Sequence, residues 1–328
     1  MDSRKLFIPF RDTDRIGGPM TFMSNLRRYL DRSGFPYTRS PLFARGIFFP
    51  VAFNQPVIKL IKFFGGKVIQ RLDGIYYPSK HGDGYALKNR VIKDIYAHSA
   101  DFVVFQSEYS RKQCFAMLGE KSPNEYQIIV NGVNTDLFFP DPNRVLSPEK
   151  IIFATTGSFR NADMIEPVVA ALDSLTGELN FELWVIGPVT NPQLERFVDR
   201  PYVRHLGSKN MQEVAELLRK SDVFIYSHLN PPCPNSVLEA ISSGLPVVGF
   251  DSGSMSELLS FNKELLAYVS DDVFQKYEDF DYRKLAEKIR LAVGEYERHK
   301  KVAMENWRRY DFQECGEKYV GVFERVMK

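Results

Sequence analysis

The chain has 328 residues, of which 44% are hydrophobic and 26% are charged, and its formal net charge is +2. This composition is typical of a globular protein with enough length for two domain cores, and it excludes a disordered chain. The three cysteines are scattered without metal-ligand spacing, which excludes a cysteine-based zinc site and indicates a reducing compartment.

The charge is divided unevenly along the chain. Residues 1–150 carry 22 lysines and arginines against 14 aspartates and glutamates, whereas residues 151–328 carry 21 against 27. This asymmetry indicates two domains that meet different partners. The basic residues are scattered rather than clustered, so we expect no nucleic-acid partner. No apolar run is long enough to span a bilayer and no basic-then-apolar leader opens the chain, so we expect a cytoplasmic protein, free or at the inner face of a membrane.

Short apolar runs alternate with helical patterns in the first half, which predicts parallel β-α-β units. The predicted strands are Leu6–Phe10, Lys67–Leu72, Phe102–Gln106 and Tyr126–Val130, and the predicted helices are Met20–Asp31, Ala86–Ala97 and Glu108–Leu118. Residues 56–64 form an apolar, helix-like stretch edged by lysines. This stretch predicts either a core helix whose lysine stems cover apolar surface or a helix that touches a membrane.

The alternation restarts after a linker predicted over residues 134–150. Strands are predicted over residues 151–156, 181–186, 202–206, 223–226, 246–250 and 265–269, with helices over 164–175, 211–219 and 235–243. Residues 281–328 are mostly helical, with a break around residues 310–312. We therefore predict an α/β protein with a Rossmann-like domain over residues 1–140, a second one over 141–310, and a C-terminal helix over 311–328 that packs back on the first domain.

Residues 231–248, PPCPNSVLEAISSGLPVV, carry the most informative pattern. Asn235 or Ser236 can cap a short helix, Gly244 ends it, and an apolar strand follows. A helix that begins at the end of a strand binds phosphate well, and Glu239 one turn inside can bond a ribose diol. The alternative is an ordinary loop–helix–strand in which Glu239 is a solvated helix residue.

This stretch resembles the nucleotide-sugar motif of the family 4 retaining glycosyltransferases. The resemblance implies the GT-B fold, in which two Rossmann-like doubly wound domains face each other across a cleft. It also implies that Asn235, Ser236, Val237 and Glu239 bind the donor. Glu239 matches the second Glu of the family's Glu-x7-Glu pair, whereas Pro231 stands where the first belongs. We therefore expect sugar recognition to rely on Asn235, Ser254 and the backbone around Gly253.

Three further loops match the family pattern. Gly17 and Gly18 resemble the glycine pair that faces the donor diphosphate, although a plain tight turn would also explain them. Arg160 fits the arginine of the pyrophosphate clamp, but Asp163 occupies the slot of its lysine partner. Leu206 ends a strand where relatives hold the base of the nucleotide.

Arg71, Asp73 and Tyr76 lie at or just beyond the end of another predicted strand, and this mixture of charges and tyrosine suits recognition of an acceptor or sugar hydroxyl. A simple salt bridge between Arg71 and Asp73 is the alternative. We take Arg160, Glu239 and Asp73 as the catalytic candidates.

The expected activity is transfer of a sugar from a UDP- or GDP-linked donor, with retained configuration, to a glycan, lipid-linked or small-molecule acceptor. No cofactor and no metal are expected, because no histidine cluster follows a predicted strand and basic residues with helix N-termini are expected to neutralise the diphosphate. Two alternatives remain open: a glycan- or nucleotide-sugar-binding protein without activity, and a nucleotide-sugar 2-epimerase. The sequence does not determine the oligomeric state.

Overall fold

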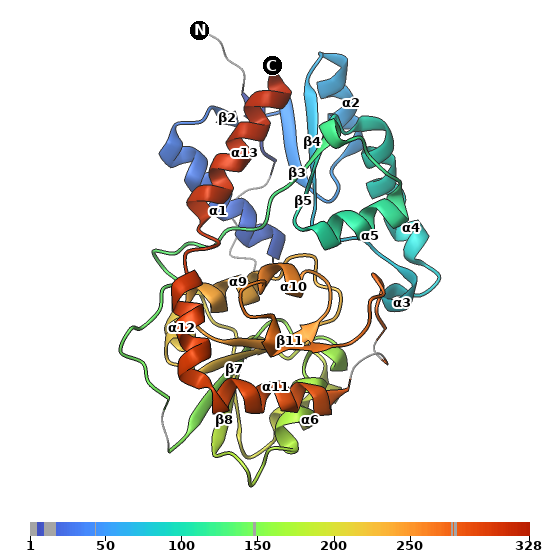
Figure 1. The fold of residues 1–328 in the computed structure, drawn as a ribbon. Coiled ribbons are helices and arrows are strands. Elements are labelled where there is room, and N and C mark those ends of the chain that lie inside the picture. The colour runs from blue at the N-terminus through green and yellow to red at the C-terminus, as the bar shows by residue number, and fades with distance from the viewer. Residues whose placement is uncertain (1–4, 10–17, 43, 147–148, 277, 279–280) are drawn as a thin grey trace. The chain divides into compact units, whose positions relative to one another are not determined.

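The structure is a computed structural model that describes residues 5–9, 18–42, 44–146, 149–276, 278 and 281–328 (Figure 1). The chain forms two compact units. Unit 1 consists of Met1–Gly132 together with Asp311–Lys328, and unit 2 consists of Val133–Tyr310. Among the described helices, none combines the length and the apolar character that crossing a bilayer requires.

Unit 1 is built on a six-stranded parallel sheet with the order β2-β1-β3-β4-β5-β6. The strands are β1 Leu6–Phe7, β2 Tyr37–Thr38, β3 Gly46–Pro50, β4 Lys67–Leu72, β5 Phe102–Phe105 and β6 Tyr126–Ile128. β2 and β3 lie outside the predicted strands. All five residues of β3 are buried, so it lacks the alternation that marks a half-exposed strand.

Helices cover this sheet, and the C-terminal helix of the chain is one of them (Figure 1). They are α1 Gly18–Ser33, α2 Gln55–Phe63, α3 Pro78–His81, α4 Tyr85–Asp94, α5 Glu108–Leu118 and α13 Phe312–Met327, with a π-helical turn at Ile95–Ser99 and a 3-10 turn at Pro123–Glu125. Tyr319 and Phe323 of α13 share a core cluster with Phe22 of α1 and Phe48 of β3. The rings of Phe48 and Phe323 are 5.1 Å apart. α13 thus completes the core of unit 1.

Unit 2 is built on a second six-stranded parallel sheet with the order β12-β11-β10-β7-β8-β9. The strands are β7 Ile151–Thr156, β8 Phe181–Ile186, β9 Val203–Gly207, β10 Val223–Tyr226, β11 Val247–Asp251 and β12 Leu266–Tyr268. The α-helices are α6 Glu166–Asp173, α7 Glu195–Val198, α8 Met211–Arg219, α9 Asn235–Ser242, α10 Met255–Leu258, α11 Tyr282–Gly294 and α12 Tyr296–Asn306, and 3-10 turns occupy Ala162–Met164, Pro192–Leu194 and Lys263–Leu265.

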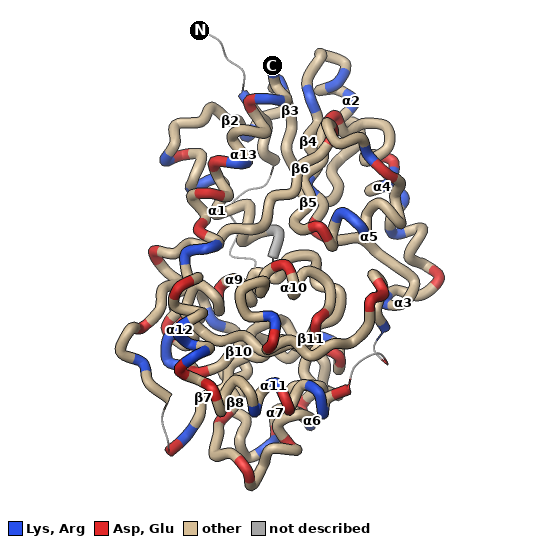
Figure 2. The backbone as a smooth tube through the Cα atoms, in the orientation of Figure 1, with Lys and Arg blue, Asp and Glu red and all other residues tan. Residues whose placement is uncertain are grey.

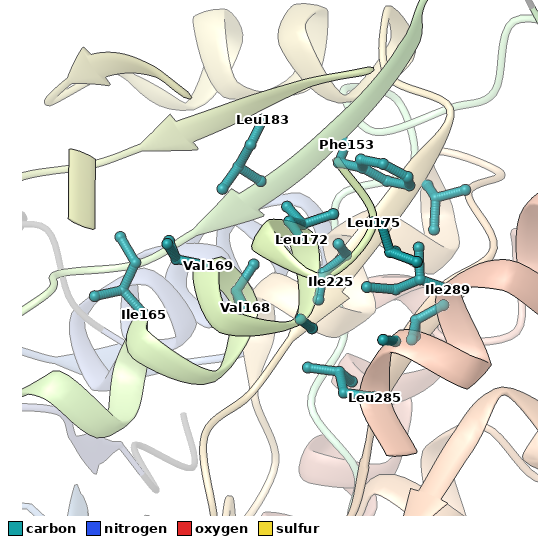
Figure 3. Close-up of a cluster of buried hydrophobic side chains, with 14 of the residues drawn as sticks. Phe153, Ile165, Val168, Val169, Leu172, Leu175, Leu183, Ile225, Leu285 and Ile289 are labelled. Carbon is teal, nitrogen blue, oxygen red and sulfur yellow. The ribbon is translucent and has the colours of Figure 1, made fainter. Parts of the chain in front are cut away.

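The main core of unit 2 lies between the sheet and helices α6 and α11 (Figure 3). Val168 and Leu172 of α6 and Leu285 and Ile289 of α11 are fully buried there. Strand residues such as Phe153 belong to the same cluster. The four helix residues recur at intervals of four, which is the spacing that places side chains on one face of a helix.

The boundary between the units lies after Gly132, not at residue 140 as predicted. The segment after Gly132 packs on unit 2, where the side chain of Arg219 donates to the carbonyl of Leu137 at 2.8 Å. Farther along, Arg144 forms an ion pair with the buried Asp222 at 2.9 Å. The predicted linker is therefore part of unit 2, because long-range polar contacts hold it there.

Candidate functional site

The strand order of unit 2 defines a switch point. From β7 the chain adds β8 and β9 on one side, and then β10 pairs with the other side of β7. Ligands of open parallel sheets bind beyond the carboxyl ends of the strands where the order reverses. At this position the loop with Arg160 follows β7, and the loop that leads into α9 follows β10. The structure thus places two of the predicted donor segments on neighbouring strands.

Helix α9 begins at Asn235, so neither Asn235 nor Ser236 is its N-cap. Its N-cap is Pro234, which makes no side-chain capping hydrogen bond, and Asn235 and Ser236 are the first two helical residues. The predicted capping role of these side chains is therefore wrong. The N–H of Ser236 has no hydrogen-bond partner within the described residues, whereas the N–H of Val237 donates to Pro234 at 3.2 Å. A helix start of this kind attracts an anion.

Glu239 lies one turn inside α9 and is half-buried. Within the part of the chain that the structure describes, its carboxyl makes no hydrogen bond or ion pair. Burial without a compensating partner raises the pKa of Glu239 to about 7. An unpaired, desolvated carboxyl costs folding free energy, and this is typical of a group kept for a ligand rather than for stability.

Arg160 is exposed in the loop after β7 and has no ion-pair partner among the described residues. Its Nε donates to the hydroxyl of Ser158 at 3.3 Å, and its carbonyl accepts from Asn191 at 3.3 Å. Asp163 lies in the 3-10 turn Ala162–Met164 and does not pair with Arg160. The guanidinium is therefore available to an anionic ligand.

A glycine follows directly after each of the strands β7 and β8. A side chain at Gly187, after β8, would overlap the carbonyl oxygen of Gly157, after β7, so these two loops are in direct contact. At the next strand the pairing register shifts between Val185 and Ile186, and Ile186 pairs with Gly207 instead of Leu206. Leu206 is therefore the extra residue of a bulge. A bulge interrupts the ladder and re-aims the backbone, which suits the predicted contact with the base.

Pro231 is buried between two loops. Gly253 has a φ of +61°, and a side chain there would lie 2.5 Å from atoms of Pro231. The N–H of Ser254 donates to the carbonyl of Pro231 at 2.9 Å. Ser254 is itself fully buried, so its hydroxyl, which we predict to contact the sugar, does not face solvent here. Pro231, which stands where the family has its first glutamate, therefore packs against Gly253 and helps to hold the loop before α9.

Two residues beside the switch point of unit 2 were absent from the predicted site. His228 lies two residues beyond the end of β10, is half-buried, and has its ring 4.6 Å from that of Tyr226. Asn230 has a φ of +56° and donates through its side chain to the carbonyl of Gln275 at 2.8 Å. A histidine two residues beyond a predicted strand is a signal that sequence reasoning could have used. The link from Asn230 to Gln275 spans 45 residues and leaves no local signal.

The switch point of unit 1 lies between β1 and β3. Gly17 lies outside the described residues, and Gly18 is the first residue of α1. At the end of β3, Val51 has a φ of +59°, which is costly for a β-branched residue. Hydrogen bonds at 2.6 Å to the carbonyl of Arg71 and at 2.7 Å from Gln70 hold it there. Such strain is typical of functional loops.

Arg71, at the end of β4, is fully buried and paired. Its guanidinium lies 2.5 Å from a carboxyl oxygen of Asp73, donates to Asn131 at 2.7 Å, and stacks on the ring of Phe22 at 3.7 Å. Burial raises the pKa of Asp73, and Arg71 opposes that rise. The salt bridge that the sequence left open as an alternative is therefore present. Both side chains position the end of β4 rather than reach toward solvent.

Tyr76 is 38% exposed, and its backbone is held by Asn89, with hydrogen bonds of 3.0 and 2.6 Å. Of the three predicted acceptor residues, Tyr76 alone presents its side chain to solvent.

No three histidine, cysteine, aspartate or glutamate side chains among the described residues gather in a way that could hold a metal ion. Two surface hollows of unit 2, of about 310 and 470 Å³, are lined by other residues than the predicted donor site. They lie around Arg219 and around Tyr202, respectively.

Comparison with known proteins agrees with this arrangement. Residues 150–289 match the family "Glycosyl transferases group 1". One subunit of the human phosphatidylinositol N-acetylglucosaminyltransferase is 26% identical over 162 residues, which are 48% of this chain and 34% of the human protein. The match thus spans about a third of that relative's length.

Solved structures resemble the whole chain. Anabaena Alr3699/HepE in complex with UDP and glucose gives a TM-score of 0.72 at 13% identity, covering 98% of this chain and 99% of that one. WaaG, a glycosyltransferase involved in lipopolysaccharide biosynthesis, gives 0.70 at 15% identity, covering 97% and 99%. The chain therefore has the GT-B fold, and its residues 150–289 match the glycosyl transferases group 1 family.

Proposed function

We propose that the protein transfers a sugar, with retained configuration, from a nucleoside-diphosphate sugar to a glycan, lipid-linked or small-molecule acceptor. The observation that carries this proposal is the start of α9, where the N–H of Ser236 has no partner among the described residues and, one turn further, the carboxyl of Glu239 is unpaired. A diphosphate and a ribose are the two groups that such a pair would bind together. UDP is the favoured nucleotide, because Alr3699/HepE was solved with UDP and with UDP-glucose.

The donor would lie across the switch point of unit 2. The diphosphate would lie between the first turn of α9 and the exposed guanidinium of Arg160, and the ribose diol would donate to the carboxylate of Glu239. The backbone at the bulge of Leu206 would contact the base. Positive charge then comes from the protein alone, so we propose that neither a metal ion nor a cofactor is needed.

The transfer requires no nucleophile from the protein. The bond between the anomeric carbon and the diphosphate oxygen breaks, and the acceptor hydroxyl forms its bond on the same face of the sugar. The acceptor proton passes to the departing phosphate oxygen. Negative charge grows on that phosphate, where Arg160 and the start of α9 would stabilise it. Asp73 would act through Arg71, by fixing the end of β4, and Tyr76 would contact the acceptor.

A panel of nucleoside diphosphates and their sugars, assayed by thermal shift, tests the donor site, because a ligand that binds only the folded state raises the melting temperature. We expect UDP or GDP to raise it and Glu239→Gln to remove the effect. Glu287→Gln, which makes the same change at an exposed position of α11, is the matched control. If no nucleotide changes the melting temperature of the wild type, the proposal fails.

A second candidate function is nucleotide-sugar binding without turnover. The burial of Pro231 favours it, because no carboxylate can occupy that slot without repacking Gly253. Slow hydrolysis of the donor separates the two candidates. An enzyme releases free nucleoside diphosphate even without an acceptor, whereas a binding protein returns the donor intact.

A further inference from the structure

Helix α2 ends in two exposed aromatic side chains. Asn54 caps the helix by accepting from the N–H of Val57, and Ile58 and Ile61 anchor it in the core of unit 1. Phe63 and Phe64 are instead 82% and 74% exposed, with their rings 5.3 Å apart. Leu60, on the same side of the helix as Phe63, is also exposed. One apolar side of the helix, with Ile58 and Ile61, therefore packs into the core, and a second apolar side is exposed.

Helix α4, whose end meets the start of α2, carries further exposed apolar side chains. Leu87 and Val91, one turn apart, are 73% and 45% exposed. The side chain of Gln55 donates to Asp94 at 2.7 Å, which ties the start of α2 to the end of α4 (Figure 1). We call Leu60, Phe63, Phe64, Leu87 and Val91 the α2–α4 face. It holds five of the eleven large apolar side chains that are exposed in the described residues.

The charge around this face is mainly positive. Residues 55–67 and 85–94 contain six lysines and arginines and a single acidic residue, Asp94. Asp94 is engaged by Gln55. Lys62 pairs with Asp101 at 3.0 Å, but Lys59 is exposed beside Leu60 and has no ion pair among the described residues. Figure 2 shows the basic positions along α2 and α4.

We propose that the α2–α4 face docks on an anionic lipid surface. Phe63 and Phe64 enter the headgroup region, and the surrounding lysines contact lipid phosphates. Exposed phenylalanine next to lysine is the pattern by which helices bind in the plane of a membrane. A second copy of the chain is the less suitable occupant, because two such faces would bring lysines of the same charge toward each other.

Flotation of the purified full chain with vesicles tests the proposal. We expect binding to phosphatidylcholine vesicles that contain phosphatidylglycerol, weakening with added salt, and little binding to phosphatidylcholine alone. Phe63→Ser with Phe64→Ser should weaken binding at least about tenfold. Lys59→Gln should weaken it about fivefold. Val145→Ser with Tyr282→Ser, which removes two exposed apolar side chains from unit 2, is the matched control and should bind like the wild type.

Two results would overturn the proposal: a wild type that does not float with anionic vesicles, or a double phenylalanine variant that floats as well as the control. Self-association in sedimentation velocity that is lost in the same variant, without lipid binding, would identify a second copy as the occupant. Circular dichroism verifies that each variant is folded. The test is independent of the proposed transferase, because the Phe63 and Phe64 variant should keep the nucleotide-induced rise in melting temperature.

Discussion

Replacing Glu239 by glutamine should make the protein more stable and less able to bind its donor. Glutamine has the shape of a protonated glutamate but carries no charge. It therefore avoids the cost of burying the ionised carboxylate of Glu239 in α9. The raised pKa of Glu239, about 7, reflects the cost of burying that charge. The free energy of unfolding and the affinity for nucleotide should therefore change in opposite directions, which is typical of residues kept for function.

The magnitude follows from linkage between proton binding and folding. The folded-state pKa of about 7 lies above the ordinary value of 4.5, so the folded state binds the proton more tightly than the unfolded state. The protonated carboxyl therefore stabilises the folded state below pH 4.5, and this stabilisation is lost as the pH rises from 4.5 through about 7. The full difference corresponds to about 3 kcal/mol, and residual exposure of the carboxyl reduces it. We expect Glu239→Gln to gain about 1–3 kcal/mol at pH 8 and less than about 1 kcal/mol at pH 5.

Urea unfolding of the wild type and of Glu239→Gln at several pH values measures this gain, with Glu287→Gln as the control that should show no dependence on pH. Titration with UDP or GDP should show a loss of about 1.5–3 kcal/mol in binding, as expected for a hydrogen bond to a charged group. If Glu239→Gln gains no stability at pH 8, or gains the same amount at pH 5, then the carboxyl is not desolvated and the reasoning fails.

The other predictions concern the same site. Turnover should survive EDTA, and complete loss that Mg²⁺ or Mn²⁺ restores would contradict the proposed role of Arg160 and α9. Arg160→Ala should lower kcat about 100- to 1000-fold with little change in donor affinity, and a near-normal kcat would place the diphosphate elsewhere. Pro231→Glu should lower the melting temperature without raising turnover, because it buries a carboxylate against Gly253; a large gain in kcat would show that the site has degenerated. Gly253→Ala should also lower the melting temperature, since alanine is strained at a φ of +61°, and an unchanged value would show that the Pro231 loop is not packed there.

Many strands and helices could be predicted because apolar runs and helical spacing depend only on neighbouring residues. The strands β4, β7, β8 and β10 have the bounds that their apolar runs predict, and α5 and α8 have the predicted bounds as well. The break at residues 310–312 marks the start of α13. The GT-B fold was predicted correctly from the motif around Glu239, because turn, helix and strand residues there depend on neighbours only a few positions away.

The tertiary structure decided what each predicted residue contacts. Arg71 and Asp73 lie at the end of a strand as a sugar-binding pair would, but Asn131 and Phe22 enclose Arg71 from segments far away in sequence. In the sequence, Pro231 stands where the family has a glutamate. Only the close approach of Gly253 in the structure shows that Pro231 is packed there. The pKa of Glu239 and the exposure of Phe63 likewise depend on which atoms surround them. Burial and pairing arise from long-range contacts, which local pattern and propensity do not encode.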